Sequence, residues 1–145
     1  MSKGSGKGSS YTSNATRGLL DTSTVIAIET GRDVDYGALP LQQYVCVITL
    51  GELNAGIHTA PDVEARASRV ASLATVSGLQ TLPITDAAAR HWGRLRARLL
   101  EAKRRLNVND LWIASVALAN DLPVVTQEAD FDVLADLGGP QVIKV

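Results

Sequence analysis

Acidic residues stand at four places in this sequence where an apolar run gives way to a polar segment, and they are the first candidates for chemistry. They are Asp21, Glu52, Asp110 and the pair Glu128 and Asp130. Carboxylates gathered at one edge of a sheet repel each other: at about 4 Å and an effective dielectric constant of about 20, each ionised pair costs about 4 kcal/mol. The pattern therefore implies a divalent cation that holds these carboxylates together.

The acids share a site only if the fold brings them together, and the hydrophobic pattern predicts a fold that does so. Short apolar runs alternate with helical periodicity, which favours a parallel sheet with helices on both faces. We expect strands at 18–21, 44–48, 79–84, 122–126 and 141–145, and helices that open at Thr22 and Thr49 or span 62–77, 85–105, 109–120 and 131–137. Ligands of such sheets bind beyond the carboxyl ends of the strands. Three of the four acidic positions fall there, and Asp110 joins them if its helix leads into strand 122–126.

Each acid also has a purely structural interpretation. Asp21 could cap the helix that follows it, and Thr49 with Glu52 matches a Thr-x-x-Glu capping box. Asn109 and Asp110 resemble an N-cap followed by a first-turn acid, and the last two acids could be solvated loop residues. Capping and catalysis are compatible, so these interpretations do not exclude a shared site.

Composition indicates one globular domain. The chain has 145 residues, of which 46% are hydrophobic and 20% charged, with a mean hydropathy of +0.08. Residues 1–18, rich in Gly, Ser and Lys, are predicted to be a disordered tail or an expression remnant, which leaves 19–145 as the domain. No apolar run approaches the roughly 20 residues of a membrane span. With Cys46 as the only cysteine, predicted to be a buried hydrophobe, a soluble protein of the reducing cytoplasm is expected.

Charge is unevenly distributed although the net charge is only −1. Residues 90–105 contain seven basic residues and one acid, Glu101. Residues 106–145 contain six acids and one basic residue, Lys144. An acidic pocket beside a basic ridge suits a metal-dependent enzyme with a polyanionic substrate. Arg90, Arg94 and Arg98 recur every four residues, so they stack on one helix face and could follow a phosphate backbone. A solvated helix face is the alternative.

Four strings around the acids resemble the PIN-domain family, and more narrowly its VapC-type toxins. They are Leu20-Asp21-Thr22-Ser23, Thr49-Leu50-Gly51-Glu52-Leu53, Asn109-Asp110-Leu111-Trp112-Ile113-Ala114 and Val125-Thr126-Gln127-Glu128-Ala129-Asp130-Phe131. They occur in the family's order and rough spacing, and the resemblance runs from about Leu19 to Val145. It implies a three-layer α/β/α fold around a parallel sheet of four or five strands.

The resemblance also implies roles for individual residues. Asp21, Glu52 and Asp110 are expected to hold Mg²⁺ or Mn²⁺, with Asp130 preferred over Glu128 as the fourth acid. Supporting polar positions are expected at Thr22, Ser23, Asn109 and Thr126, although each of these could also be a cap or turn residue. His58 and His91 stand alone, which makes a zinc site improbable. The implied reaction is hydrolysis of RNA, often transfer RNA, to a 5′-phosphate and a 3′-hydroxyl.

Partners follow from the same resemblance. VapC-type toxins pair with a VapB-type antitoxin whose tail occupies the acidic cleft, and they commonly form homodimers. Four large apolar residues could lie at such contacts, but a core location is the favoured interpretation for them: Tyr36, Leu41, Trp92 and Trp112.

Three rival functions remain. A phospho-accepting receiver domain needs a Lys closing a late strand, and Lys144 is too close to the terminus. The run from Gly4 to Ser10 lacks the Gly-Lys-Ser/Thr ending of a phosphate-binding loop. The more serious rival is a catalytically silent PIN-like module that only binds RNA or protein.

Overall fold

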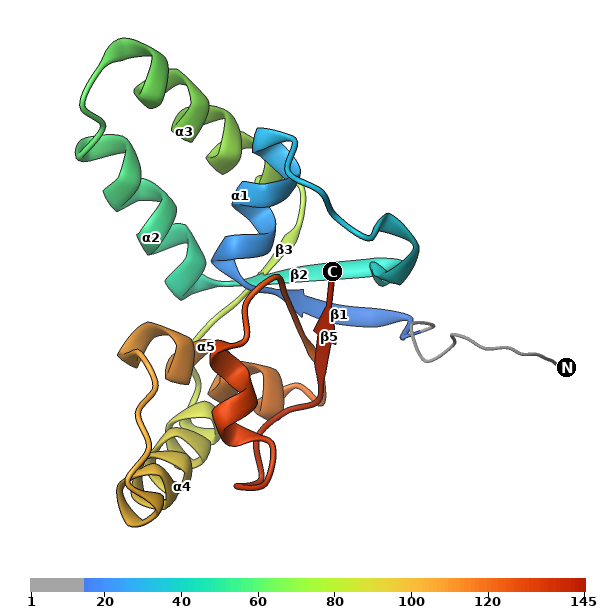
Figure 1. The fold of residues 1–145 in the computed structure, drawn as a ribbon, viewed down its shortest axis with the longest axis vertical. Coiled ribbons are helices and arrows are strands. Elements are labelled where there is room, and N and C mark those ends of the chain that lie inside the picture. Colours follow the sequence, from blue (N-terminus) through green and yellow to red (C-terminus); the bar gives the residue numbers. More distant parts are fainter. Residues whose placement is uncertain (1–14) are drawn as a thin grey trace, which may run out of the picture.

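The computed structural model describes residues 15–145 (Figure 1). Residues 1–14, most of the predicted tail, lie outside the described part. The first strand, β1 (Arg17–Leu20), includes Gly18, where a strand was expected to begin, and also Arg17, which had been assigned to the tail alone. The amide of Gln42 also donates to the carbonyl of Thr16, so ordered contacts of the sheet begin just before β1.

A parallel five-stranded sheet forms the centre of the fold, as the sequence predicts. Its order is β3-β2-β1-β4-β5, and every neighbouring pair is parallel. The other strands are β2 (Gln42–Cys46), β3 (Gln80–Leu82), β4 (Val124–Thr126) and β5 (Val142–Lys144). Leu19 of β1 lies in register with Tyr44 of β2 and with Val124 of β4. Since β1 is central, the residue that follows it stands at the middle of the carboxyl edge.

Helices cover both faces of this sheet, which confirms the predicted three-layer α/β/α architecture. They are α1 (Thr22–Thr30), α2 (Val47–His58), α3 (Val63–Val76), α4 (Asp86–Ala102) and α5 (Val108–Ala119), with short 3-10 helices η2 (Tyr36–Ala38) and η3 (Asp130–Leu134). In Figure 1, α2 and α3 pack together on one side and α4 packs against α5 on the other. The sheet thus lies between two helical layers, one on each face.

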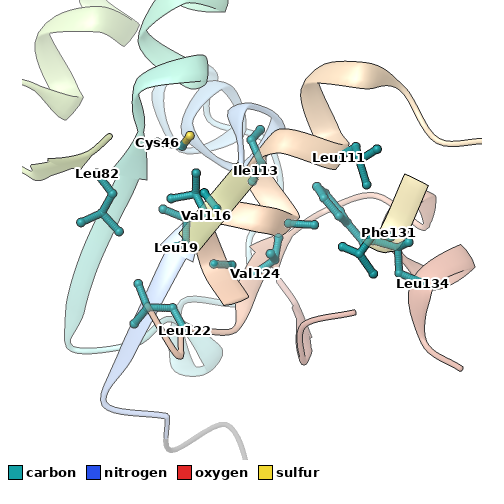
Figure 2. Close-up of a cluster of buried hydrophobic side chains, with 14 of the residues drawn as sticks. Leu19, Cys46, Leu82, Leu111, Ile113, Val116, Leu122, Val124, Phe131 and Leu134 are labelled. Atoms are coloured by element: carbon teal, nitrogen blue, oxygen red, sulfur yellow. The ribbon is translucent and has the colours of Figure 1, made fainter. Parts of the chain in front are cut away.

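Successive strand residues enter two different cores, which explains why the strands are apolar without alternation. Leu19 and Val124 belong to a cluster with α4, α5 and η3, which Figure 2 shows in close-up. Their neighbours Leu20 and Val125 belong to a second cluster with α1, α2 and α3. Cys46 is buried in the first cluster, as predicted, and burial raises the pKa of its thiol.

Several helix boundaries differ from those predicted, among them the expected helix 131–137, which is the 3-10 helix η3 and ends at Leu134. Helix α2 begins at Val47 after Cys46, so Thr49 does not open it and the predicted capping box is wrong. Helix α5 is capped by Asn107 and not by Asn109. Helix α4 ends at Ala102 because Lys103 takes a left-handed conformation with φ 57°, three residues before the expected end.

The large apolar residues considered for partner contacts divide into two groups. Trp92 packs against the first core cluster and its ring stacks on Trp112 at a centroid distance of 5.1 Å, in line with the core interpretation. Tyr36 and Leu41 are 59% and 89% exposed, so the core interpretation is wrong for both. They lie around the start of β2, near the amino edge of the sheet. Within residues 15–145, no helix combines the length and the apolar composition that crossing a membrane requires.

Candidate active site

Four segments bring the predicted acids to the carboxyl edge of the sheet. Asp21 follows β1 directly, and Glu128 and Asp130 follow β4, the neighbour of β1. Glu52 lies in the second turn of α2, and Asp110 lies in the first turn of α5, a helix that contacts α2 (Figure 1). Helix α5 leads into β4. This was the condition for expecting Asp110 at the same edge as the other acids.

Asp21 is the most buried acid of this group, with 3% of its surface exposed. It caps α1, as predicted, by accepting a hydrogen bond from the amide of Thr24 at 3.0 Å. The hydroxyl of Thr126 donates to Oδ2 at 2.6 Å, and the hydroxyl of Ser23 lies 2.8 Å from Oδ1. These donors fix the carboxylate in one orientation at the end of β1.

Glu52 is oriented by the two other predicted supporting residues. The hydroxyl of Thr22 donates to Oε1 at 2.6 Å, and Nδ2 of Asn109 donates to Oε2 at 3.3 Å. The hydroxyl oxygens of Thr22 and Thr49 lie 3.0 Å apart. Because the single proton of Thr22 faces the carboxylate, Thr49 supplies the proton of that second contact. The side chain of Glu52 therefore joins the starts of α1 and α5 to α2.

Asp110 responds most strongly to this environment, since its pKa is raised from 3.8 to about 6. Burial of the half-buried carboxyl is the largest cause, followed by repulsion from Asp21, Glu52, Asp130 and Glu128, in that order. A carboxylate in the first turn of a helix is normally favoured by the helix dipole, so these effects outweigh the dipole. All five predicted acids therefore share one electrostatic site.

The fourth acid is the least constrained part of the site. Glu128 and Asp130 are both exposed: Glu128 lies in the turn between β4 and η3, and Asp130 is the first residue of η3. The amide of Glu128 donates to the Thr126 hydroxyl at 2.9 Å, which links this turn to Asp21 through Thr126. Asp130 raises the pKa of Asp110 more than Glu128 does. The choice of Asp130 over Glu128 stays a prediction.

A hydrated ion fits these residues better than a closed metal cage does. Within residues 15–145, no three His, Cys, Asp or Glu side chains form a group that could enclose a metal ion. The raised pKa of Asp110 shows nevertheless that several carboxylates act on one another here. Repulsion among the acids without a close group of three ligands is compatible with a Mg²⁺ site, because Mg²⁺ keeps several waters and takes only one or two carboxylates. An all-oxygen site of this kind suits Mg²⁺ or Mn²⁺ and does not suit zinc.

The predicted phosphate-binding stripe on α4 is only partly formed. Arg90 is exposed, whereas Arg94 is half-buried and its Nε atom is buried without a hydrogen-bond partner among the described residues. Arg98 donates to the carbonyl of Leu137 at 2.8 Å and packs against Gly138, where a Cβ atom would clash with the guanidinium. Arg98 thus supports the segment after η3, and an RNA-binding role for the three arginines stays a prediction.

Sequence reasoning missed three polar residues that build the site. Asn107 caps α5 by accepting from the amides of Asn109 and Asp110, and its position three residues before Asp110 was an available signal. Thr24 is fully buried and ties α1 to β4 through the carbonyl of Val125. Thr49 meets Thr22 across 27 positions, and no local pattern announces that contact.

Comparison with known proteins identifies the relatives of this chain. The model of the PIN domain matches residues 18–137. The chain is 45% identical over 128 residues to Ribonuclease VapC5 of Mycobacterium tuberculosis, covering 88% of this chain and 95% of that protein. It is 37% identical over 125 residues to Ribonuclease VapC4 of the same species, covering 86% and 95% respectively.

Solved structures show the same similarity. VapBC-5 of Mycobacterium tuberculosis, from the VapBC family of toxin-antitoxin systems, matches with a TM-score of 0.83 and 42% identity over 90% of this chain and 99% of that chain. VapBC2 of Rickettsia felis, bound to a DNA fragment from its promoter, matches with a TM-score of 0.70. Its identity of 23%, over 88% of this chain and 98% of that one, supports the shared fold alone.

Proposed function

This chain belongs to the PIN domain family, and from that premise we propose that it is a metal-dependent endoribonuclease, the toxin of a VapC-type toxin-antitoxin pair. The observation that supports this most directly is the electrostatic site at the carboxyl edge, where four other acids contribute to raising the pKa of Asp110 to about 6. Such mutual repulsion is unfavourable unless a cation binds, and perturbed pKa values of this kind cluster at functional sites.

Within this proposal each residue has a defined task. Asp21, Glu52 and Asp110 hold Mg²⁺ or Mn²⁺, with Asp130 or Glu128 completing the set. When bound, the ion would supply Lewis-acid chemistry for activating water and neutralising charge on the leaving oxygen. Four hydroxyl and amide side chains keep the carboxylates in place through their hydrogen bonds: Thr22, Ser23, Asn109 and Thr126. Such supporting contacts commonly change metal affinity or activity by about 10 to 100-fold.

The proposed substrate is RNA, with a structured RNA such as transfer RNA as the expected target and inhibition of translation as the outcome. Cleavage is expected to leave a 5′-phosphate and a 3′-hydroxyl. We expect this activity in the cytoplasm, where cellular RNA and an antitoxin would be accessible. Uncompensated basic residues on α4 and just after it favour a polyanionic substrate.

The proposed protein partner is a VapB-type antitoxin, in a hetero-oligomer that can include two toxin copies. Among the similar solved structures are a member of the VapBC family of toxin-antitoxin systems and a toxin-antitoxin complex from Klebsiella pneumoniae. A hollow of about 500 Å³ between α1, α2 and α3 reaches Glu52 and is lined largely by apolar and small side chains. A tail that fills this hollow and places a basic residue against Glu52 would block the acids.

Removal of the metal tests the proposed activity directly. Purified protein is incubated with total RNA and Mg²⁺ or Mn²⁺, with and without EDTA. We expect cleavage only with free metal, because without it the carboxylates carry no ion to activate water. Cleavage that persists in EDTA contradicts the proposal. A folded protein that binds RNA but never cleaves it, with either metal, would favour the silent binding module.

Replacing Thr22 by Val tests whether Glu52 needs its hydrogen-bonded orientation. The substitution removes the 2.6 Å contact to Oε1, and we expect cleavage to fall about 10 to 100-fold, with a higher Mg²⁺ concentration at half-maximal rate. Thr22→Ser keeps the hydroxyl and is expected to restore both values. Thr30→Val is the matched control, because that exposed hydroxyl bonds only to the carbonyl of Ile26. An unchanged Mg²⁺ requirement in Thr22→Val would contradict the positioning role.

A further inference from the structure

A second charged hollow lies between the end of α4 and the start of α5. Its volume is about 470 Å³, and its lining includes four basic residues: Arg96, Lys103, Arg104 and Arg105. Among residues 15–145, no acidic side chain lines it. None of these four residues belongs to the stripe of Arg90, Arg94 and Arg98, and none of the site acids lines the hollow.

Three of the four basic residues are uncompensated. Arg104 forms a two-pronged ion pair with Asp136, at 2.6 and 3.1 Å, and also donates to the carbonyl of Val133. For Arg96, Lys103 and Arg105, the described chain provides neither an ion pair nor a side-chain hydrogen bond. All three are exposed. Three free cations around one hollow form a surface complementary to a multiply charged anion.

The backbone at Lys103 places one of these cations at a cost. Lys103 ends α4 in the left-handed conformation, with φ 57° and ψ 38°, and its amide bonds to the carbonyls of Leu99 and Leu100. Glycine usually occupies this position because other residues are strained there. A lysine in its place carries this backbone strain, its cation is favoured at the end of the helix by the helix dipole, and its ammonium group is exposed.

The first turn of α5 separates the hollow from the acidic site. Val108 and Leu111 line the hollow, whereas Asp110, two residues after Val108, lies on another side of the same helical turn. Leu100 and Val108 are each 59% exposed and supply aliphatic surface beside the cations. Cations beside an aliphatic surface suit a nucleic-acid strand, because its phosphates can contact the cations and its sugars or bases can contact the aliphatic side chains.

We propose that this hollow binds the backbone of a single-stranded RNA segment next to the cleaved bond. Arg96, Lys103 and Arg105 contact phosphates that flank the one at the acids, and Leu100 and Val108 contact the sugars or bases between them. The inference rests on the proposed ribonuclease function and assigns its substrate path. Arg98, which is held by the Leu137 carbonyl, is then a support of the C-terminal segment and not part of that path.

Binding of RNA without cleavage tests the hollow directly. A short fluorescent single-stranded RNA of mixed sequence is titrated with protein in EDTA at several salt concentrations. We expect Arg96→Ala/Arg105→Ala to weaken binding about tenfold and to lower the slope of log K against log salt by about 1.4, since each phosphate contact on a single strand contributes about 0.7.

Arg17→Ala/Arg32→Ala is the charge-matched control. Arg17 opens β1 and Arg32 follows α1, so both lie at the sheet edge opposite the acids. We expect this double variant to keep most of the wild-type salt slope. Equal losses in the two double variants would show that only net charge matters, and this result would overturn the proposal.

Lys103→Gly separates binding from folding. Glycine adopts the left-handed conformation without strain, so the melting temperature should stay equal or rise while RNA affinity falls several-fold. If Lys103 served only the fold, its replacement would lower the melting temperature and leave the RNA affinity unchanged. Retained affinity in Lys103→Gly would remove this residue from the path.

Cleavage kinetics distinguish failure of the hollow from failure of the nuclease function. If wild-type protein cleaves RNA with Mg²⁺ and both double variants share its KM, the hollow is refuted while the function stands. If wild-type protein never cleaves RNA but the two double variants still differ in salt slope, the function fails and the hollow remains an RNA-binding site. A raised KM with little change in kcat for Arg96→Ala/Arg105→Ala supports both.

Discussion

Replacing Asp110 by Asn is expected to reduce RNA cleavage about 10³-fold while making the metal-free protein more stable. Loss of one metal-binding carboxylate removes several kcal/mol of transition-state stabilisation, and each factor of ten corresponds to about 1.4 kcal/mol. The same substitution relieves repulsion from Asp21, Glu52, Asp130 and Glu128 and the cost of burying a charge. Activity and stability should therefore change in opposite directions.

The stability gain has a defined pH dependence. The pKa of Asp110 is raised from 3.8 to about 6, so between about pH 4 and pH 6 the folded protein binds more protons than the unfolded chain. The free energy of unfolding of the wild-type protein falls as pH rises through this window, and the Asp110→Asn protein lacks this decrease. The full shift corresponds to about 3 kcal/mol, and solvent screening of the half-exposed carboxyl reduces it to about 1 to 2 kcal/mol.

Urea unfolding in EDTA at pH 4 and pH 7.5 measures this difference. We expect the two proteins to be equally stable at pH 4 and the variant to be more stable at pH 7.5. Added Mg²⁺ should stabilise the wild-type protein more than the variant, because the ion binds the folded site. Glu101→Gln, a charge-matched change at an exposed acid of α4, should leave cleavage and the pH profile unaltered. A variant that is less stable than wild type at pH 7.5 would contradict the electrostatic account of the site.

Much of the site could be predicted because strand ends are visible in a sequence. The apolar run Gly18 to Leu20 ends at Asp21, and the apolar run before Thr126 ends at a polar turn. The two strands are parallel neighbours, so the carboxylates and hydroxyls at their ends lie at the same edge of the sheet. The two hydrophobic cores reflect the same property, since apolar runs without alternation require cover on both faces. Local patterns therefore gave the three layers and the grouping of the acids.

Contacts between distant segments could not be predicted in this way. The string around Thr49 matches a capping box, but pairing of Cys46 with Leu82 fixes the end of β2, and α2 begins before Thr49 is reached. Thr49 then faces Thr22 in the site. Arg98 lies on the predicted helix face, yet its guanidinium finds a carbonyl 39 positions away. In each case the partner belongs to another element, so the residues next to Thr49 or Arg98 in the sequence do not predict the contact.

Replacing Asp21 by Ala should abolish cleavage and also destabilise the fold, in contrast to the change at Asp110. The substitution removes the cap of α1, which is worth about 0.5 to 2 kcal/mol. It also leaves the buried hydroxyl of Thr126 without its 2.6 Å acceptor, at a cost of about 1 to 3 kcal/mol. Relief of repulsion with Asp110 offsets part of this loss. We expect a net loss of about 2 to 4 kcal/mol in the free energy of unfolding and a cleavage rate lower by about 10³-fold.

Asp21→Asn separates the two effects of this residue. The amide oxygen can still accept from the amide of Thr24, so most of the capping energy is retained, whereas the charge required for the metal is lost. The Nδ2 group cannot accept from the Thr126 hydroxyl, so we expect a loss of about 1 to 3 kcal/mol by urea unfolding, smaller than in Asp21→Ala, together with the same loss of cleavage. Active Asp21→Asn protein would show that Asp21 serves only as a cap. Because Asp21 is held by donors and Asp110 by none that the described residues provide, the two acids carry the same chemistry with opposite consequences for folding.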